Sequence, residues 1–296
     1  MERKLAAVLS SAALLFGLAA CANEGSAGDK LMVLSTFSII EDIAKNIAGD
    51  AVKVRSITDH GAEIHGYEPT PSDIAAASDA DMILANGLNL EHWIDKLLTH
   101  STAKRVTVTE GIEPINIEHS ETPNPHAWMS PALAKTYVDN IVSALSELAP
   151  DAADTFRNNG DAYKAELDGV DRELTEGLRS LPENRRTLVS CEGAFSYLAR
   201  EAHMKEGYIW PVNSNGEITS GEISKAASFV RENQVPAVFC ESTVGKGPHE
   251  QLRQETGAKN GGALFVDSLS PADGPVPTYL DLISYDVKTI VSGLSQ

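Results

Sequence analysis

Residues 31–57, LMVLSTFSIIEDIAKNIAGDAVKVRSI, decide the fold class of this chain. They open with a short apolar run, LMVLS (31–35), which is typical of a buried strand. The next segment, FSIIEDIAKNIAG (37–49), has apolar residues at helical spacing and ends at Gly49, a residue suited to a helix C-terminus. VKVRSI (52–57) then returns to a strand pattern. A strand, a helix and a second strand in this order predict a parallel sheet covered by helices.

The same alternation continues through both halves of the chain. In the first half we expect further strands at 81–86 and 105–109 and further helices at 71–78 and 90–98. In the second half we expect strands at 187–191, 207–212, 237–241 and 263–269, and helices at 194–202, 220–233, 248–256 and 279–294. The sequence therefore predicts an α/β protein with two lobes, residues 30–150 and 182–296, each a mainly parallel sheet flanked by helices.

A long helical stretch, residues 151–181, separates the two halves. Its apolar residues recur at spacings of three, four or seven and form one stripe: Phe156, Tyr163, Leu167, Val170, Leu174, Leu178 and Leu181. Three glycines, Gly160, Gly169 and Gly177, weaken the helix by up to about 1 kcal/mol each relative to alanine. The stretch is either an ordinary amphipathic helix of one lobe or a rod that joins both. Its length favours the rod, since about 30 helical residues span about 45 Å.

The N-terminus has the pattern of an export signal. Arg3 and Lys4 precede an apolar run, residues 5–18, that is too short for a membrane span. The sequence Leu-Ala-Ala-Cys at 18–21 resembles the bacterial lipobox, so we expect a signal peptide over residues 1–20 and lipidation of Cys21. Residues 21–29 would then form a flexible tether to the membrane. The alternative is an ordinary secretory signal that lies near a cysteine by chance.

The chain is strongly acidic, with a formal net charge of -18. Such a surface repels phosphate backbones, which argues against nucleic-acid binding. It attracts cations weakly, although acidity also serves solubility alone.

Two cysteines, Cys191 and Cys240, lie at the ends of apolar strand-like runs. Buried free thiols are common in such positions, and we expect two thiols here. A disulfide is the alternative in an exported protein.

Four side chains that can bind a metal lie close to the ends of predicted strands: His65, His126, Glu192 and Asp267. In open α/β sheets, ligands bind outside the carboxyl ends of the strands. Two of these residues belong to each half, so a cleft between the halves could gather two imidazoles and two carboxylates. Imidazole with carboxylate suits first-row divalent ions, and oxygen donors with high coordination favour Mn²⁺ or Fe²⁺ over structural Zn²⁺.

Each of the four residues also has an ordinary structural interpretation. His65 could be a solvated loop residue, His126 a packed one, Glu192 a helix cap and Asp267 a turn anchor. We interpret the remaining histidines as surface residues: His60, His92, His100, His119, His203 and His249. His60 and His119 are the first to check, because they are nearest in sequence to His65 and His126.

Several motifs in one order give the chain a family resemblance over nearly all of its mature length. They are HGYEPTPSDI (65–74), NGLNLEHW (86–93), NPHAWMSP (124–131), CEGAFSYLA (191–199), AVFCEST (237–243) and VDSL (266–269). With these motifs the chain resembles the metal-binding solute-binding lipoproteins of bacterial ABC transporters, which capture manganese, iron or zinc. The resemblance implies two α/β lobes joined by a single long helix, with the metal in the cleft between the lobes.

The resemblance also implies the ligands, position by position: His65, His126, Glu192 and Asp267. Members that look zinc-specific have a histidine at the third position, whereas manganese or iron members have glutamate, as here. The chain also lacks the long histidine-rich loop of many zinc members. It departs from the family pattern at Glu63 and Ile64, where Asp-Pro is common, and at Cys191, where serine is more usual.

The sequence analysis thus predicts a monomeric receptor, lipid-anchored outside the membrane, that binds Mn²⁺ or Fe²⁺ and delivers it to an ABC permease without catalysis. One alternative is a zinc receptor of the same type. A non-haem metalloenzyme and an adhesin with a structural metal are less favoured, and the chain lacks G-x-S-x-G, P-loop and H-E-x-x-H motifs.

Overall fold

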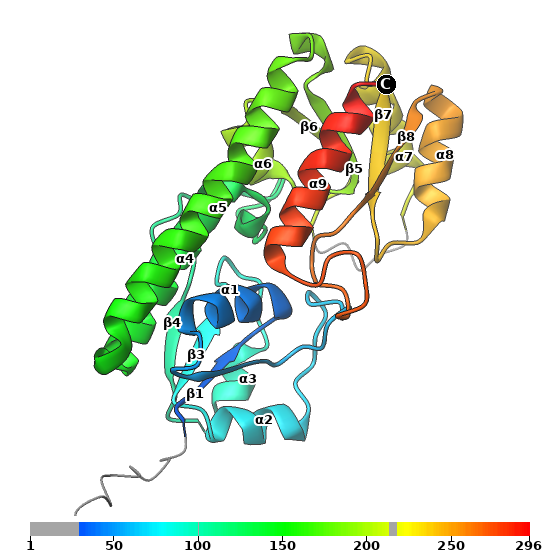
Figure 1. Cartoon of the computed structure of the whole chain (residues 1–296). Coiled ribbons are helices and arrows are strands. Elements are labelled where there is room, and N and C mark those ends of the chain that lie inside the picture. Colours follow the sequence, from blue (N-terminus) through cyan, green and yellow to red (C-terminus); the bar gives the residue numbers. More distant parts are fainter. Residues whose placement is uncertain (1–29, 100, 213–217) are drawn as a thin grey trace, which may run out of the picture. The chain divides into compact units, whose positions relative to one another are not determined.

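The computed structural model describes residues 30–99, 101–212 and 218–296 (Figure 1). The predicted signal peptide (1–20), Cys21, the tether (21–29) and His100 lie outside these residues. Within them, no helix is long and apolar enough to cross a membrane.

The first half folds around a four-stranded parallel sheet in the order β2-β1-β3-β4. Its strands are β1 (Met32–Ser35), β2 (Lys53–Ser56), β3 (Met82–Ala85) and β4 (Lys104–Thr107). Its helices are α1 (Ser38–Ala48), α2 (Pro71–Ser78) and α3 (Ile94–Leu98). The α/β prediction for this half is confirmed.

Local chemistry explains where two of these helices begin. Thr70 and Asp73 form a reciprocal capping box at the start of α2, and Pro71 occupies its first turn. The prediction of a helix over 90–98 was too long, because the chain enters this region with Leu88 and Asn89 at positive φ and α3 begins only at Ile94.

The second half consists of two parallel strand pairs. β5 (Thr187–Glu192) pairs with β6 (Lys205–Trp210), and β7 (Ala237–Glu241) pairs with β8 (Lys259–Leu264). β5 also lies beside β7. The helices are α6 (Ser196–Glu201), α7 (Ser220–Glu232), α8 (Lys246–Thr256) and α9 (Tyr279–Leu294).

The last strand differs from its prediction. The expected strand over 263–269 is β8 at Lys259–Leu264, so Asp267 lies in the loop after it. Two glycines conceal this strand in the sequence, because glycine has low strand propensity. At Gly261 a Cβ would clash with the Phe239 ring, so the neighbouring side chain requires the glycine.

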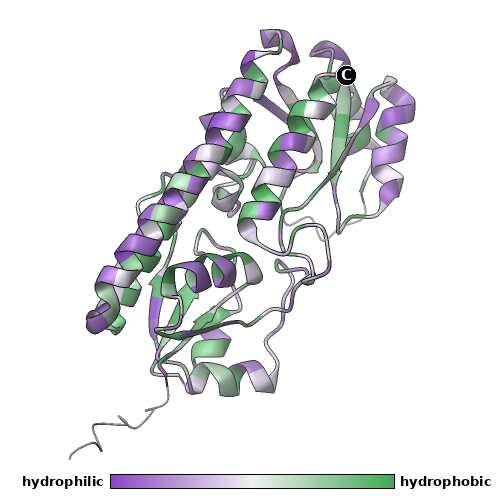
Figure 2. Ribbon diagram, in the orientation of Figure 1, coloured by the Kyte–Doolittle hydropathy of each residue, from purple (hydrophilic) through white to green (hydrophobic). Residues whose placement is uncertain are grey.

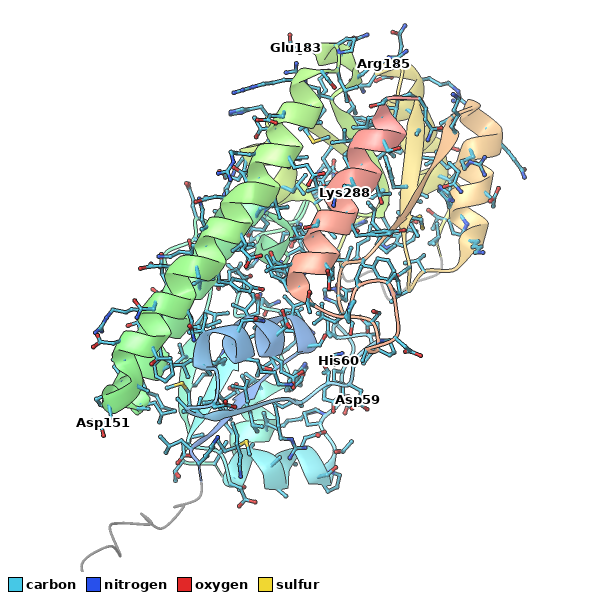
Figure 3. The ribbon with its side chains drawn as sticks, in the orientation of Figure 1. Asp59, His60, Asp151, Glu183, Arg185 and Lys288 are labelled. Carbon is cyan, nitrogen blue, oxygen red and sulfur yellow. A yellow bond between two sulfur atoms is a disulfide. The ribbon has the colours of Figure 1, made fainter. Side chains whose placement is uncertain are left out.

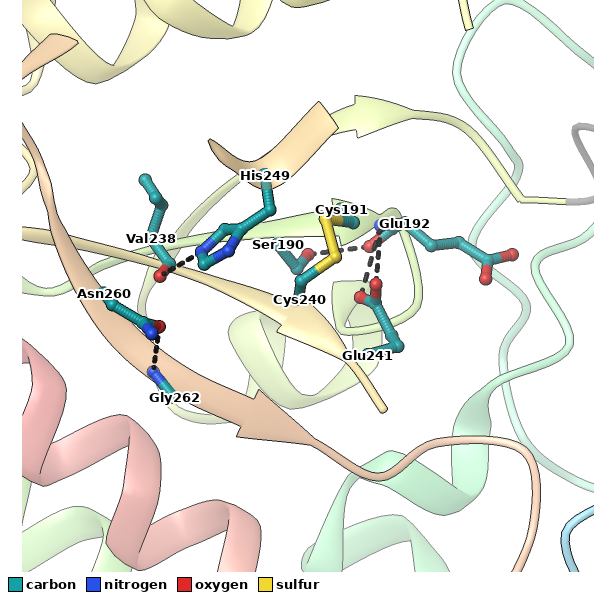
Figure 4. Close-up of a disulfide and its surroundings, with 9 residues drawn as sticks. All are labelled: Ser190, Cys191, Glu192, Val238, Cys240, Glu241, His249, Asn260 and Gly262. Atoms are coloured by element: carbon teal, nitrogen blue, oxygen red, sulfur yellow. Dashed lines mark hydrogen bonds between the residues drawn. A yellow bond between two sulfur atoms is a disulfide. The ribbon is translucent and has the colours of Figure 1, made fainter. Parts of the chain in front are cut away.

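The two cysteines form a disulfide between β5 and β7, Cys191–Cys240, with Cα atoms 4.8 Å apart (Figure 4). Our expectation of two free thiols was wrong. The physical reason is that β5 and β7 are neighbours and hold both residues at the same level, an adjacency that strand patterns in the sequence do not reveal.

One long helix lies between the halves in sequence. α5 (Ala153–Arg179) confirms the helix predicted within 151–181, and the seven residues of the apolar stripe are buried, six of them in α5 and Leu181 just after it. Most of its visible outer face is hydrophilic (Figure 2). α5 packs against α1 of the first half and α9 of the second. The exact lobe boundaries (30–150, 151–181 and 182–296) remain predictions.

The helix α4 (Pro131–Leu148) was not predicted, although Ser130 caps it and Pro131 opens it. Three short 3-10 helices complete the described chain: η1 (Ala127–Met129), η2 (Pro150–Ala152) and η3 (Glu183–Arg185).

Two of the three glycines in α5 are required by close packing. A Cβ at Gly160 would lie 2.5 Å from Cγ2 of Val142 in α4, and one at Gly177 would lie 2.6 Å from Cγ2 of Val291 in α9. A Cβ at Gly169 would meet only the tip of Arg172, at 3.8 Å. The glycines at 160 and 177 therefore let neighbouring helices approach α5 closely, and Gly169 has no such role.

This difference predicts opposite effects of the same substitution. Gly160→Ala should lower the free energy of unfolding by about 1–3 kcal/mol, because the stiff Val142 side chain must move. Gly169→Ala, the matched control, should raise it by up to about 1 kcal/mol through helix propensity. Urea unfolding of both variants measures the effects, and equal changes of one sign would contradict the packing argument.

Candidate metal centre

Loops and strand ends bring the four predicted residues to one place. His65 lies in the loop after β2, and His126 immediately precedes η1. Glu192 is the last residue of β5, and Asp267 lies in the loop after β8. All four are buried. Two come from each half of the chain, as the sequence analysis expected.

Three donor atoms form a compact triangle. Nε2 of His65 lies 3.2 Å from Nε2 of His126. Oδ1 of Asp267 lies 3.5 Å from the first nitrogen and 3.4 Å from the second. Ligands at tetrahedral angles and bond lengths of about 2.1 Å are about 3.4 Å apart, so this spacing suits a single divalent ion. Oε1 of Glu192 is slightly farther, 3.9 Å from Nε2 of His65.

Asn124 fixes the orientation of the His126 ring. Its Oδ1 accepts from Nδ1 of His126 at 2.8 Å and from the backbone N–H of the same residue at 3.1 Å. With Nδ1 as the donor, the Nε2 lone pair faces the other three side chains. The Asn124 amide also donates to the Gly193 carbonyl at 2.7 Å, so it links the His126 loop to the residue after Glu192.

A buried polar network also supports the loop that carries His126. Asn86 donates to the Pro125 carbonyl at 3.0 Å and accepts from the Tyr137 hydroxyl at 2.6 Å. The Glu91 carboxylate accepts from the backbone N–H of Asn86 at 2.6 Å. Burial raises the pKa of Glu91 despite these hydrogen bonds. The NGLNLEHW motif is therefore structural, and it holds the backbone that carries His126.

The loop that carries Asp267 is anchored at the two residues that precede it. The Trp128 indole donates to the Val266 carbonyl at 2.9 Å, and the backbone N–H of Phe265 donates to Oδ1 of Asp286 in α9 at 3.0 Å. Two separate elements of the fold thus fix the backbone that leads into Asp267.

The two residues before His65, at which the sequence departs from the family pattern, both interact with the rest of the fold. The Glu63 side chain accepts from the backbone N–H groups of His65 at 2.8 Å and Gly66 at 3.0 Å. Ile64 is buried in the core. The Glu63 carboxylate therefore stiffens this loop by hydrogen bonding.

Sequence analysis missed Glu241, a buried carboxyl group next to Glu192 (Figure 4). Its Oε1 and Oε2 accept from the backbone N–H of Glu192 at 3.2 and 3.3 Å. Burial raises the pKa of Glu241 well above the ordinary value, and the charge of Glu192 adds to this effect. An acidic residue at the end of a buried strand was the available signal, since Glu192 occupies the equivalent position in β5.

The surroundings shift the pKa values of the two imidazoles in opposite directions. Burial lowers the pKa of His65, but the hydrogen bond and charge of Asp267 and the charge of Glu192 outweigh it and raise the pKa to about 9. Burial lowers the pKa of His126 to about 4. Burial acts to raise the pKa of Asp267, yet the two histidines that face Oδ1 hold it below the ordinary value. In the absence of metal, a protonated His65 therefore compensates the buried carboxylate.

The donor set has the chemistry of a cation site. Nδ1 of His65 and Oδ1 of Asp267 are buried and have no hydrogen-bond partner among the described residues. Unpaired buried carboxylate oxygens are costly, and a divalent ion bound by imidazole and carboxylate would offset that cost.

The other histidines of the described chain lie apart from this centre. His92, His119 and His203 are exposed, as expected, and His60 contacts Glu41 and Ser270. The surface interpretation of His249 was wrong, because its ring is buried and Nε2 donates to the Val238 carbonyl at 3.1 Å.

Comparisons with known proteins agree with this geometry. Residues 33–293 match the family described as zinc-uptake complex component A, periplasmic. The chain is 46% identical to the iron-binding protein YfeA of Yersinia pestis, over 93% of this chain and 89% of that one. It is 36% identical to the manganese-binding lipoprotein MntA of Halalkalibacterium halodurans, over 91% and 90% of the two chains. The Mn-bound periplasmic metal binding protein from Candidatus Liberibacter asiaticus has 39% sequence identity and a TM-score of 0.85, covering 90% of this chain and all of its own.

The raised pKa of His65 predicts a pH-dependent stability of the metal-free protein. Its folded-state pKa of about 9 exceeds the ordinary value of 6.5, so the stabilisation is fully present below about pH 6.5 and is lost as the pH rises through about 9. The loss should be on the order of 3 kcal/mol. Urea unfolding of chelator-treated protein measures it. His65→Gln should abolish this alkaline decline and His119→Gln should retain it; a decline that persists in His65→Gln would contradict the assignment.

Proposed function

The chain belongs to the zinc-uptake complex component A family of metal-binding proteins, and on that premise we propose that it is an extracytoplasmic receptor that captures one Mn²⁺ or Fe²⁺ ion and delivers it to an ABC permease. In this proposal the ion binds to His65, His126, Glu192 and Asp267.

The observation that carries the proposal is the convergence of two imidazole nitrogens and a carboxylate oxygen at 3.2–3.5 Å from one another. Ordinary packing does not favour an arrangement that buries such groups together with a second carboxylate, Glu192. A bound divalent cation explains it, since it needs the lone pairs that these four side chains supply.

Glu192 is the basis for proposing manganese or iron as the cargo. Its carboxylate adds an oxygen donor that can bind through one or both oxygens, which suits Mn²⁺ and Fe²⁺. The names of two relatives agree, one being an iron-binding protein and the other a manganese-binding lipoprotein. Zinc is the alternative, because the family is named for zinc uptake and Zn²⁺ binds such sites more tightly than Mn²⁺ does.

Delivery to a permease and attachment to the membrane are inferred from the relatives. Several of them are named as substrate-binding lipoproteins of metal or manganese ABC transporters. We propose the same arrangement here, with a lipid on Cys21, residues 21–29 as the tether and a monomeric receptor outside the membrane. The signal-like N-terminal sequence supports this proposal.

Catalysis has less support than transport. A metalloenzyme keeps a coordination position open for water or substrate, whereas here four protein side chains would surround the ion. The relatives are likewise named for binding or transport.

Metal analysis tests the proposal directly. Purified protein exposed to Mn²⁺ should hold about one ion per chain, and His65→Ala combined with Glu192→Ala should lose it, because two of the four donors are removed. The matched control is His92→Ala with Glu113→Ala, both exposed, which should bind as the wild type does. An unchanged metal content in the first variant would reject these ligands.

A second experiment tests the metal preference. Glu192→His replaces an oxygen donor by a nitrogen donor and should shift the ratio of Mn²⁺ to Zn²⁺ affinity towards zinc by about tenfold or more. Competition between the two ions for one chelator measures this ratio. Glu192→Asp keeps a carboxylate and should retain the wild-type preference, whereas an unaltered ratio in Glu192→His would count against the role of Glu192 in selection.

A further inference from the structure

Hydrogen bonds join the loop that carries Asp267 to the first half of the chain. We define the seam as the contacts of residues 38, 60 and 61 with residues 268–270, together with the contact between His60 and Glu41. The Ser268 hydroxyl accepts from the backbone N–H of Gly61 at 2.7 Å and lies 3.2 Å from the Ser38 hydroxyl. The backbone N–H of Leu269 donates to the Ser38 hydroxyl at 3.0 Å. The seam therefore begins one residue after Asp267.

His60 contributes two further contacts to the seam. Its Nδ1 lies 3.2 Å from the Ser270 carbonyl oxygen, and its Nε2 lies 3.1 Å from Oε2 of Glu41 in α1. Figure 3 shows His60 beside the loop that precedes α9. A single side chain thus bridges a helix of the first half and the loop that follows Asp267.

The chemistry of both partners makes the His60 ring the donor in this bridge. A carbonyl oxygen only accepts hydrogen bonds, and so does a carboxylate oxygen. Burial acts to raise the pKa of Glu41, but hydrogen bonds from Lys45 and His60 outweigh it and lower the pKa, so Glu41 is ionised.

Few charged groups surround the His60 ring. On α1, Glu41 is its direct partner, and Lys45 lies 2.7 Å from the other oxygen of that carboxylate. Asp59 precedes His60 in the chain (Figure 3). Among the described residues, Glu41 is the sole ionisable group within ion-pair distance of the His60 ring. The loop side contributes the Ser270 carbonyl.

We propose that His60 is a positioning residue that ties the loop of Asp267 to α1 and thereby slows metal release. The inference rests on the proposed metal-receptor function. His60 touches neither the ion nor its ligands, and it acts through Ser270 on the loop that carries Asp267.

The ratio of release rates between a His60 variant and the wild type isolates the contribution of this bridge, because the metal-binding side chains are the same in both proteins.

The experiment uses full-length protein loaded with Mn²⁺ and mixed with excess chelator. His60→Gln cannot donate in two opposed directions and should release Mn²⁺ about tenfold faster than wild type. Glu41→Gln, which keeps the shape but loses the charge, should also accelerate release. The double variant should be no faster than His60→Gln alone, because the two residues form one bridge.

His92→Gln is the matched control, since Nδ1 of its ring lies 3.2 Å from the Asn89 carbonyl oxygen within the same turn, and it should match the wild type. If wild-type protein loads Mn²⁺ and both seam variants release it at the wild-type rate, the inference alone is wrong. Additive accelerations in the double variant also overturn it, because they indicate two independent structural effects. If wild-type protein holds no Mn²⁺, the proposed function falls and the inference with it.

Discussion

The burial of carboxylates at the meeting point of the two halves is the constraint on which the rest of the site depends. Glu192, Glu241 and Asp267 are all less than a tenth exposed, and ionised carboxyl groups are costly to remove from water. The fold answers this cost in two ways. Two imidazoles face Asp267, and the backbone N–H of Glu192 is directed at Glu241. In the metal-free state a protonated His65 compensates the carboxylate charge. In the metal-bound state the proposed cation would compensate it instead.

The hydrogen bonds around the site hold the backbone of the loops as well as their side chains. Asn124 orients His126, Glu63 stiffens the turn of His65, and Trp128 holds the carbonyl before Asp267. Each of these three proposed ligands is therefore positioned by a hydrogen bond with a neighbour in its own loop or with a distant element.

Strand and helix patterns were sufficient to predict the α/β architecture, and the positions of His65, His126, Glu192 and Asp267 near strand ends were sufficient to suggest a shared site. Their role as metal ligands remains a prediction. Three features could not be predicted from local patterns. The Cys191–Cys240 disulfide depends on which strands are neighbours, β8 is concealed by glycines that packing requires, and the roles of Glu241 and His60 depend on partners far away in sequence.

The wide separation of the four residues along the chain has a consequence for biosynthesis. Asp267 follows His65 by some two hundred positions, and its loop is anchored by Asp286 in the terminal helix α9. A growing polypeptide therefore lacks part of the proposed metal site until Asp267 and its anchor Asp286 have been made. Contacts between segments that are far apart in sequence form slowly in folding. Metal acquisition would accordingly be the closing event of maturation, and an ion once bound would stabilise the finished chain and none of its precursors.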